Sequence, residues 1–109
     1  LEVFQYESPD QNKTPPKNSD IGGHHLAFYV DDMDEAIAFL KSEGVEVQGE
    51  PTSYTEGPNL GLTWCYFKAP WGQQLEVVSA PKGTVYDNEA KTSGKTRLFN
   101  PALAKETLI

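Results

Sequence analysis

The chain has 109 residues, a formal net charge of −7 and 38% hydrophobic residues. This length allows one domain at most, and the acidic balance argues against nucleic-acid binding, which requires clustered Lys and Arg. No apolar run approaches the roughly 18 residues of a membrane span. The single cysteine, Cys65, cannot form an internal disulfide, which favours a reducing, cytoplasmic compartment.

The first segment, Leu1–Tyr6, alternates apolar and polar residues and predicts a strand. Its opening letters, Leu1-Glu2-Val3, return as Leu75-Glu76-Val77 in a second strand-like run, Gln73–Ser79. This repeat suggests that the chain opens inside a duplicated fold whose first half is mostly missing. Between the two, residues 7–20 are rich in Pro, Asn, Ser and Asp and predict an exposed linker.

A strand is predicted over Gly23–Val30, and the clearest helix of the chain follows it. Asp32 can cap this helix, and Glu35 completes a pair that resembles a capping box. Gly44 supplies the left-handed stop. The apolar residues at the i, i+3, i+4, i+7 spacing of one helix face are Met33, Ala36, Ile37 and Leu40. We therefore expect this face to be buried.

The remaining predicted elements are short. They are a strand at Val45–Gln48, a loop over 52–60, an aromatic strand at Thr63–Lys68, a turn at Ala69–Gly72 and an antiparallel strand at Gln73–Ser79. Residues 81–109 show little periodicity apart from a last turn near Ala102–Leu108. We expect this tail to form an extended wrap or to be partly disordered.

Side chains alternate across a strand, so their parity predicts two different sheet faces. One face is apolar and suits the helix: Leu26, Phe28, Val30, Leu75 and Val77. The other face is polar and aromatic: His25, Tyr29, Trp64, Tyr66, Gln74 and Glu76. A sheet covered on one side only can curl around a ligand. We predict that His25 and Glu76 meet on this second face, and that Cys65, of opposite parity to Trp64, is inert in the core.

Three stretches in this order resemble the second half of a vicinal oxygen chelate protein. They are His24–Asp32, Lys41–Val45 and Phe67–Glu76. That superfamily includes glyoxalase I, bleomycin-resistance proteins and extradiol dioxygenases. The resemblance implies an α+β fold of paired βαβββ modules, each a curved mixed sheet with a helix on one face. It divides the chain into the last strand of a truncated first module (1–7), a linker (8–22), the second module (23–80) and a C-terminal tail (81–109).

The resemblance also implies a metal site. Its ligands would be His25 and Glu76 from the first and last strands of the second module, with Glu2 as a third. The fourth position, at the start of the first module, has no counterpart here, so a complete site needs another chain or a missing N-terminal half. The implied cofactor is a divalent ion, and Zn, Ni, Fe, Mn and Co are not distinguished.

The implied activity is that of a metal-dependent lyase, isomerase or dioxygenase acting on a small molecule with vicinal oxygens. Glu76 would be the catalytic carboxylate, and the substrate pocket would be lined by Tyr29, Trp64, Tyr66 and Gln74. One alternative is a metal-free protein of the same fold that binds a small molecule such as an antibiotic. Another is a half-fold that exists only as a homodimer and has no activity of its own.

Each of these residues also has a simpler interpretation. His25 can be a histidine satisfied by ordinary hydrogen bonds, and Glu2 an exposed terminal residue. Glu76 must be paired, protonated or metal-bound, because a lone buried carboxylate is costly. Trp64 and Tyr66 can belong to ordinary core packing.

Overall fold

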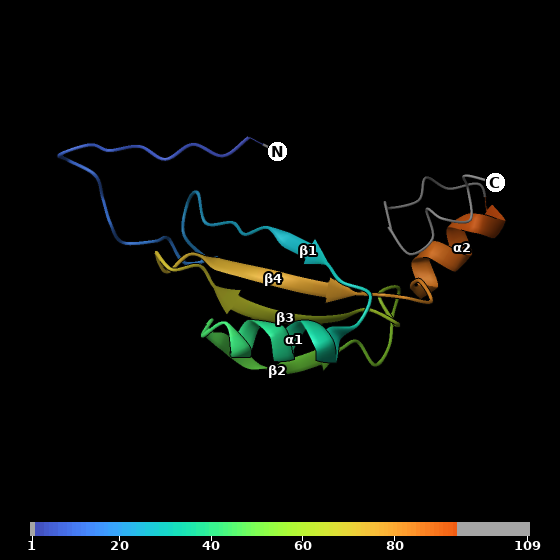
Figure 1. Cartoon of the computed structure of the whole chain (residues 1–109). Helices are drawn as coiled ribbons and strands as arrows, with labels where there is room; N and C mark the ends of the chain where they lie inside the picture. The colour runs from blue at the N-terminus through green and yellow to red at the C-terminus, as the bar shows by residue number, and fades with distance from the viewer. Residues whose placement is uncertain (1, 94–109) are drawn as a thin grey trace.

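The structure, a computed structural model, describes residues 2–93 (Figure 1). Its elements in chain order are β1 (Ala27–Tyr29), α1 (Met33–Ser42), β2 (Val47–Ser53), β3 (Thr63–Lys68), β4 (Gln74–Ser79) and α2 (Val85–Ser93). The strands form one sheet in the order β1-β4-β3-β2. β1 is parallel to β4, and the other two pairs are antiparallel. The predicted α+β module with a mixed four-stranded sheet is confirmed.

Helix α1 begins and ends as the sequence predicts. The Asp32 carboxylate accepts a hydrogen bond from the Glu35 backbone N–H at 2.9 Å, which satisfies one of the free donors of the first turn. Gly44 follows the helix with a φ of 72°, a conformation that glycine adopts without steric cost. The helix lies across one face of the sheet (Figure 1).

The hydrophobic core lies between α1 and the sheet. Its buried members are Met33, Ile37, Cys65 and Val77, and the half-buried side chains packed against them are Val30, Leu40, Val47 and Phe67. The predicted helix stripe therefore does face the apolar side of the sheet. Leu26 and Phe28 share the parity of this side but are exposed. Since β1 is an edge strand and α1 contacts β2 and β4, the helix leaves these two side chains uncovered.

Two predicted strands have different bounds in the structure. The strand expected over Gly23–Val30 is reduced to β1, although hydrogen bonds to Leu26 and from Val30 extend its pairing with β4. The strand expected at Val45–Gln48 instead runs on to Ser53, so the loop predicted from residue 52 begins too early. Pro51 is tolerated because β2 is an edge strand whose register with β3 shifts between Gln48 and Thr52.

The prediction of an extended tail is wrong for residues 85–93, which form α2. Thr84 and Asp87 cap this helix reciprocally: the Thr84 N–H donates to Asp87 Oδ2 at 2.9 Å, and the Asp87 N–H donates to Thr84 Oγ1 at 3.2 Å. The backbone N–H groups of Val85 and Tyr86 donate to carbonyls of the loop before β3. The turn predicted near residues 102–108 lies outside the described residues.

The strand predicted for Leu1–Tyr6 does not form over residues 2–6. The N-terminal segment instead runs extended and stands clear of the sheet (Figure 1), with Val3, Phe4 and Tyr6 exposed. An alternating sequence becomes a strand only when a neighbouring strand pairs with its backbone, and the described residues supply none here.

Neither of the two described helices is long and apolar enough to cross a membrane.

Candidate functional site

His25 and Glu76 meet on the sheet face opposite α1. Nε2 of His25 and Oε2 of Glu76 lie 2.7 Å apart and share a hydrogen bond, and the two side chains are 23% and 14% exposed. His25 lies just before β1, and the next residue of its face, Ala27, is paired in register with Glu76. The parallel pairing of β1 and β4 thus produces the contact that strand parity predicts.

Three amide side chains continue the network from His25. Its Nδ1–H donates to Oδ1 of Asn18 at 3.3 Å. The Asn18 amide nitrogen donates to Oε1 of Gln74, and the Gln74 amide nitrogen donates to Oε1 of Gln48 at 3.2 Å. Strand parity predicts Gln74 on this face. It does not predict Asn18, because Asn18 lies in the polar segment interpreted as a linker, and no sequence pattern connects it with residues so far along the chain.

Aromatic rings flank the pair. The Tyr66 ring meets the His25 ring edge-to-face, with centroids 5.2 Å apart and an angle of 87°. Burial, followed by the negative charge of Glu76, raises the pKa of Tyr66 above its ordinary value. Trp64 lies further along the same face of β3 and packs against Tyr54 with centroids 4.7 Å apart. Trp64 and Tyr66 are half-buried on the open face rather than enclosed in the core.

Two other predicted site residues lie apart from the pair. Tyr29 shares the face but lies opposite Val78 at the far end of β1. Its pKa is raised, first by burial and then by the charge of Asp31, while the Ala80 backbone offsets part of the rise. Glu2 lies in the exposed N-terminal segment, and the structure does not bring it to His25 and Glu76.

The pair fits part of a metal site. An imidazole nitrogen and a carboxylate oxygen suit Zn and the other divalent transition metals. A ligating histidine also normally has its other ring nitrogen held by an acceptor, as Asn18 holds it here. In residues 2–93, however, no group of three His, Cys, Asp or Glu side chains is placed to hold a metal ion. Further ligands would have to come from elsewhere.

Cys65 behaves as its parity predicts. It is 2% exposed within the core, and burial, followed by the charge of Glu50, raises the pKa of its thiol. A buried thiol with a raised pKa carries little thiolate at neutral pH. Cys65 therefore has no place in a nucleophilic mechanism.

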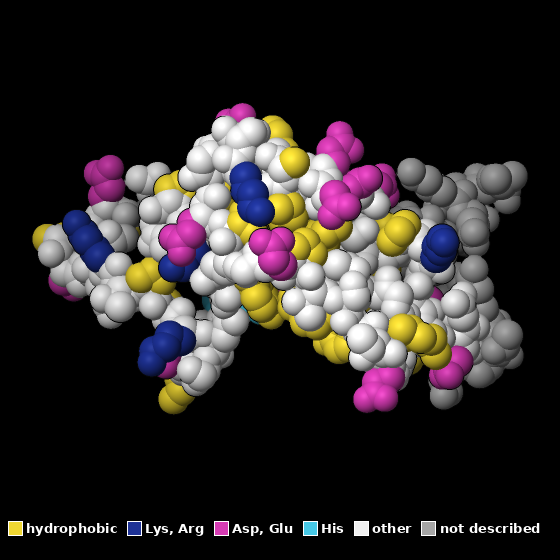
Figure 2. Space-filling model, turned by 90° about the horizontal axis from the view of Figure 1, so that it is seen from below, with side chains coloured by type: hydrophobic (Ala, Val, Ile, Leu, Met, Phe, Trp, Pro, Cys, Tyr) yellow, Lys and Arg dark blue, Asp and Glu magenta, His cyan; other side chains and the backbone are white. Residues whose placement is uncertain are grey.

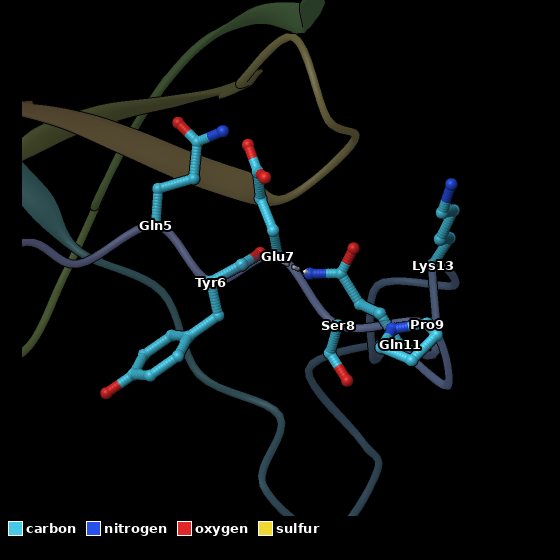
Figure 3. A pocket seen from close by; sticks show the side chains of 7 residues that line it. All are labelled: Gln5, Tyr6, Glu7, Ser8, Pro9, Gln11 and Lys13. Carbon is cyan, nitrogen blue, oxygen red and sulfur yellow. Dashed lines mark hydrogen bonds between the residues drawn. The ribbon is translucent and has the colours of Figure 1, made fainter.

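The N-terminal hollow and the face seen from below show neither converging polar side chains nor a basic stripe among the described residues (Figure 2 and Figure 3). The hollow is lined by Gln5, Tyr6, Glu7, Ser8, Pro9, Gln11 and Lys13. Gln5 and Glu7 point to one side of the backbone and Tyr6 to the other, so the side chains do not converge (Figure 3). Seen from below, Lys and Arg side chains lie singly with acidic groups between them, and the described residues form no basic stripe on this face (Figure 2).

The chain is similar in sequence to a known protein superfamily and to two of its relatives. Residues 2–66 match the profile of the Glyoxalase/Bleomycin resistance protein/Dioxygenase superfamily. The chain is 44% identical over 102 residues to a 2-epi-5-epi-valiolone epimerase of Actinomyces, a match that covers 93% of the chain and 54% of the relative. It is 31% identical over 77 residues to an uncharacterized Escherichia coli protein, YaeR, covering 71% of the chain and 55% of that protein.

Two solved structures share the fold. The glyoxalase family protein of Enterococcus faecalis aligns with a TM-score of 0.52 and 31% identity, covering 64% of this chain and 53% of that one. The glyoxalase family protein of Bacillus cereus aligns with a TM-score of 0.52 and 22% identity, covering 63% and 44%. The chain thus spans about half the length of the curated relatives it matches, 54% and 55%.

Proposed function

Since the chain belongs to the Glyoxalase/Bleomycin resistance protein/Dioxygenase superfamily, we propose that it supplies half of the site of a metal-dependent isomerase that epimerises a small molecule with vicinal oxygens. The observation that carries this proposal is the contact between His25 and Glu76 on the uncovered sheet face. The relative named an epimerase, 44% identical over 93% of the chain, favours isomerisation over lyase or dioxygenase chemistry.

A divalent cation held by His25 and Glu76 would supply Lewis acidity toward the substrate's oxygens. Epimerisation beside a carbonyl breaks one C–H bond and forms another on the opposite face of the same carbon, so no atoms are gained or lost. Glu76 is the carboxylate placed to accept or return that proton. Its half-buried position beside Tyr66 limits the water that would compete for the proton.

Inversion requires a second group on the other side of the carbon. We assign this role to Glu2, because Leu1-Glu2-Val3 repeats the residues around Glu76 and the family match begins at residue 2. In this proposal residues 1–7 are the last strand of a first module, which a complete site would place opposite the second. Glu2 would then also be the third metal ligand.

The neighbouring side chains would form the substrate pocket. Tyr66 offers a ring beside His25, Trp64 offers a second ring further along the same face of β3, and Gln74 offers an amide within the hydrogen-bonded network. Tyr29 would line the far end. Because the described residues supply only two metal ligands, the complete site needs a first module or a second copy of the chain. A cytoplasmic homodimer is part of this proposal.

The alternative, a metal-free binding protein, would favour a cationic side chain as the partner of Glu76. The partner in the structure is His25, whose neutral imidazole can ligate a metal, rather than Lys or Arg, which serve only as cations. We therefore rank the enzyme first. The two functions differ in a simple observable, since only the enzyme exchanges substrate hydrogen with solvent.

The test is epimerisation of 2-epi-5-epi-valiolone in D₂O by the full-length protein, loaded in turn with Zn, Ni, Fe, Mn or Co. We expect deuterium at the inverted carbon, detected by NMR, and loss of activity on chelation. Glu76→Gln should lower the rate by about 10²–10⁴-fold because a general base is removed. Glu46→Gln, which changes an exposed carboxylate paired with Lys68 at 2.9 Å, is the matched control.

Three results would contradict the proposal. A wild-type protein that binds none of the five metals would refute metal dependence. Unchanged deuterium incorporation by Glu76→Gln would refute the role of that carboxylate. Tight binding of the substrate without exchange would favour the metal-free binding protein.

A further inference from the structure

We infer that Asn18 is a positioning residue, which acts through His25 and aims its Nε2 at the metal position beside Glu76. The inference rests on the proposed function, since it assigns a role to a residue of the same site. Its basis is the chain of side-chain contacts from His25 through Asn18 to Gln74. Asn18 belongs to the segment that connects the N-terminus to β1, so that segment contributes to the site.

The backbone around Asn18 is fixed by a hydrogen-bonded turn. The Asp20 N–H donates to the Lys17 carbonyl at 3.0 Å, and the Lys17 N–H donates to Asp20 Oδ2 at 2.8 Å. The Gly23 N–H then donates to the Asp20 carbonyl at 2.8 Å. A Cβ on Gly23 would lie 2.0 Å from the Lys17 carbonyl oxygen, so this close approach requires glycine.

The Asn18 amide is itself oriented. Its nitrogen donates to Gln74, which in turn donates to Gln48 at 3.2 Å. The amide oxygen is therefore the atom left to face the imidazole, and an oxygen can only accept. Nδ1 of His25 must then carry a proton, and the ring cannot turn over without losing this bond.

The hydrogen bond to Asn18 decides which ring nitrogen of His25 faces the metal position. With Nδ1 held by Asn18, the metal-binding atom of His25 is Nε2, which already lies 2.7 Å from the carboxylate of Glu76. Partners of this kind typically change metal affinity by about 10–100-fold when they are removed. An imidazole without Asn18 could present either nitrogen in either ring orientation.

The experiment compares two substitutions at one position. Asn18→Leu keeps a similar size but removes the acceptor, while Asn18→Asp keeps an acceptor oxygen. We expect Asn18→Leu to weaken binding of Zn²⁺ and of Co²⁺, added alone and followed by calorimetry, by about 10–100-fold, and Asn18→Asp to bind as tightly as wild type. Asn12→Leu is the control, because Asn12 lies in the same segment and its side chain accepts a hydrogen bond from the nearby Thr14 N–H at 3.0 Å.

A second readout needs no metal. The chain has two histidines, and His24 Nδ1 bonds to the Gly22 carbonyl at 2.8 Å, so His24 is an internal reference. In NMR spectra of the metal-free protein, the Nδ1 proton of His25 should exchange slowly with water in wild type and in Asn18→Asp. It should exchange rapidly in Asn18→Leu, with the His24 signal unchanged.

Unchanged exchange of the His25 Nδ1 proton in Asn18→Leu would overturn the inference, regardless of the metal affinities measured by calorimetry. Equal losses of metal affinity in Asn18→Leu and Asn18→Asp would also overturn it, because the acceptor would not matter. If wild type binds no metal, the proposed function fails, and the exchange measurement still decides whether Asn18 positions His25. Gly23→Ala, which displaces the turn while keeping Asn18, should lower metal affinity in the same direction.

Discussion

The two faces of the sheet differ in what they require for stability. On the face under α1, buried apolar side chains such as Ile37 and Val77 fill the space between helix and strands, and folding alone accounts for them. The opposite face carries half-buried His25, Tyr66 and Glu76 in a hydrogen-bonded arrangement, which contributes little to a core. The side chains that stability does not explain therefore lie on the uncovered face. Substitutions on each face test this difference between them.

The largest effect on folding should come from the covered face. Ile37→Ala removes a buried side chain from the packing of α1 against the sheet, and should lower the free energy of unfolding by about 2–4 kcal/mol. Phe39→Ala in the same helix, where the ring is 62% exposed, is the control and should change it by less than about 0.5 kcal/mol. Urea denaturation measures both, and equal losses would show that α1 does not pack as described.

On the open face, a substitution should affect metal binding more than it affects stability. His25→Ala should lower metal affinity by about two orders of magnitude, since it removes one of the two described ligands. The free energy of unfolding should fall by about 1–3 kcal/mol, because Glu76, only 14% exposed, loses its hydrogen-bond partner. Calorimetry with Zn²⁺ and urea denaturation of the same sample give both numbers. A large loss of stability with unchanged metal binding would make the pair structural.

Chemical modification offers a smaller contrast between the faces. Cys65, buried and with a raised pKa, should react with iodoacetamide at neutral pH at least about tenfold more slowly than a free thiol. Adding urea to unfold the protein should restore the normal rate. Fast labelling of the folded protein would place Cys65 outside the core.

The smallest expected effect is a pH dependence of Tyr66. Its pKa is raised in the folded state, so the folded protein holds this proton more tightly than the unfolded chain does. The resulting stability is fully present below the ordinary tyrosine pKa of about 10 and is lost as the pH rises through the folded value. Tyr66→Phe should reduce this alkaline loss, and Glu76→Gln should bring the Tyr66 pKa, measured by ultraviolet absorbance, part of the way back toward normal.

The sequence predicts the parts of this molecule that depend on local periodicity. The cap at Asp32, the helix stripe and the strands on either side of the Ala69–Gly72 turn all follow from residues near one another. The meeting of His25 and Glu76 also follows, because alternation along each strand fixes the face and the βαβββ resemblance supplies the pairing.

The parts that sequence misses depend on distant partners. Helix α2 has little apolar character, and its signal was the Thr84–Asp87 capping pair, which is short and common. Residues 2–6 have a strand pattern but no neighbouring strand in the described part of the chain. Asn18 is positioned by a turn and by residues more than fifty positions later, which no local pattern encodes.

The two outer strands of the sheet have unequal capacity to accept another strand. The β2 edge contains Gly49, Pro51 and a shifted register, features that discourage pairing with a further backbone. The β1 edge has no proline or bulge within Ala27–Tyr29 and carries the exposed side chain of Phe28. Extension of this sheet is therefore directional: an added strand, native or aggregating, is favoured beside β1 and disfavoured beside β2.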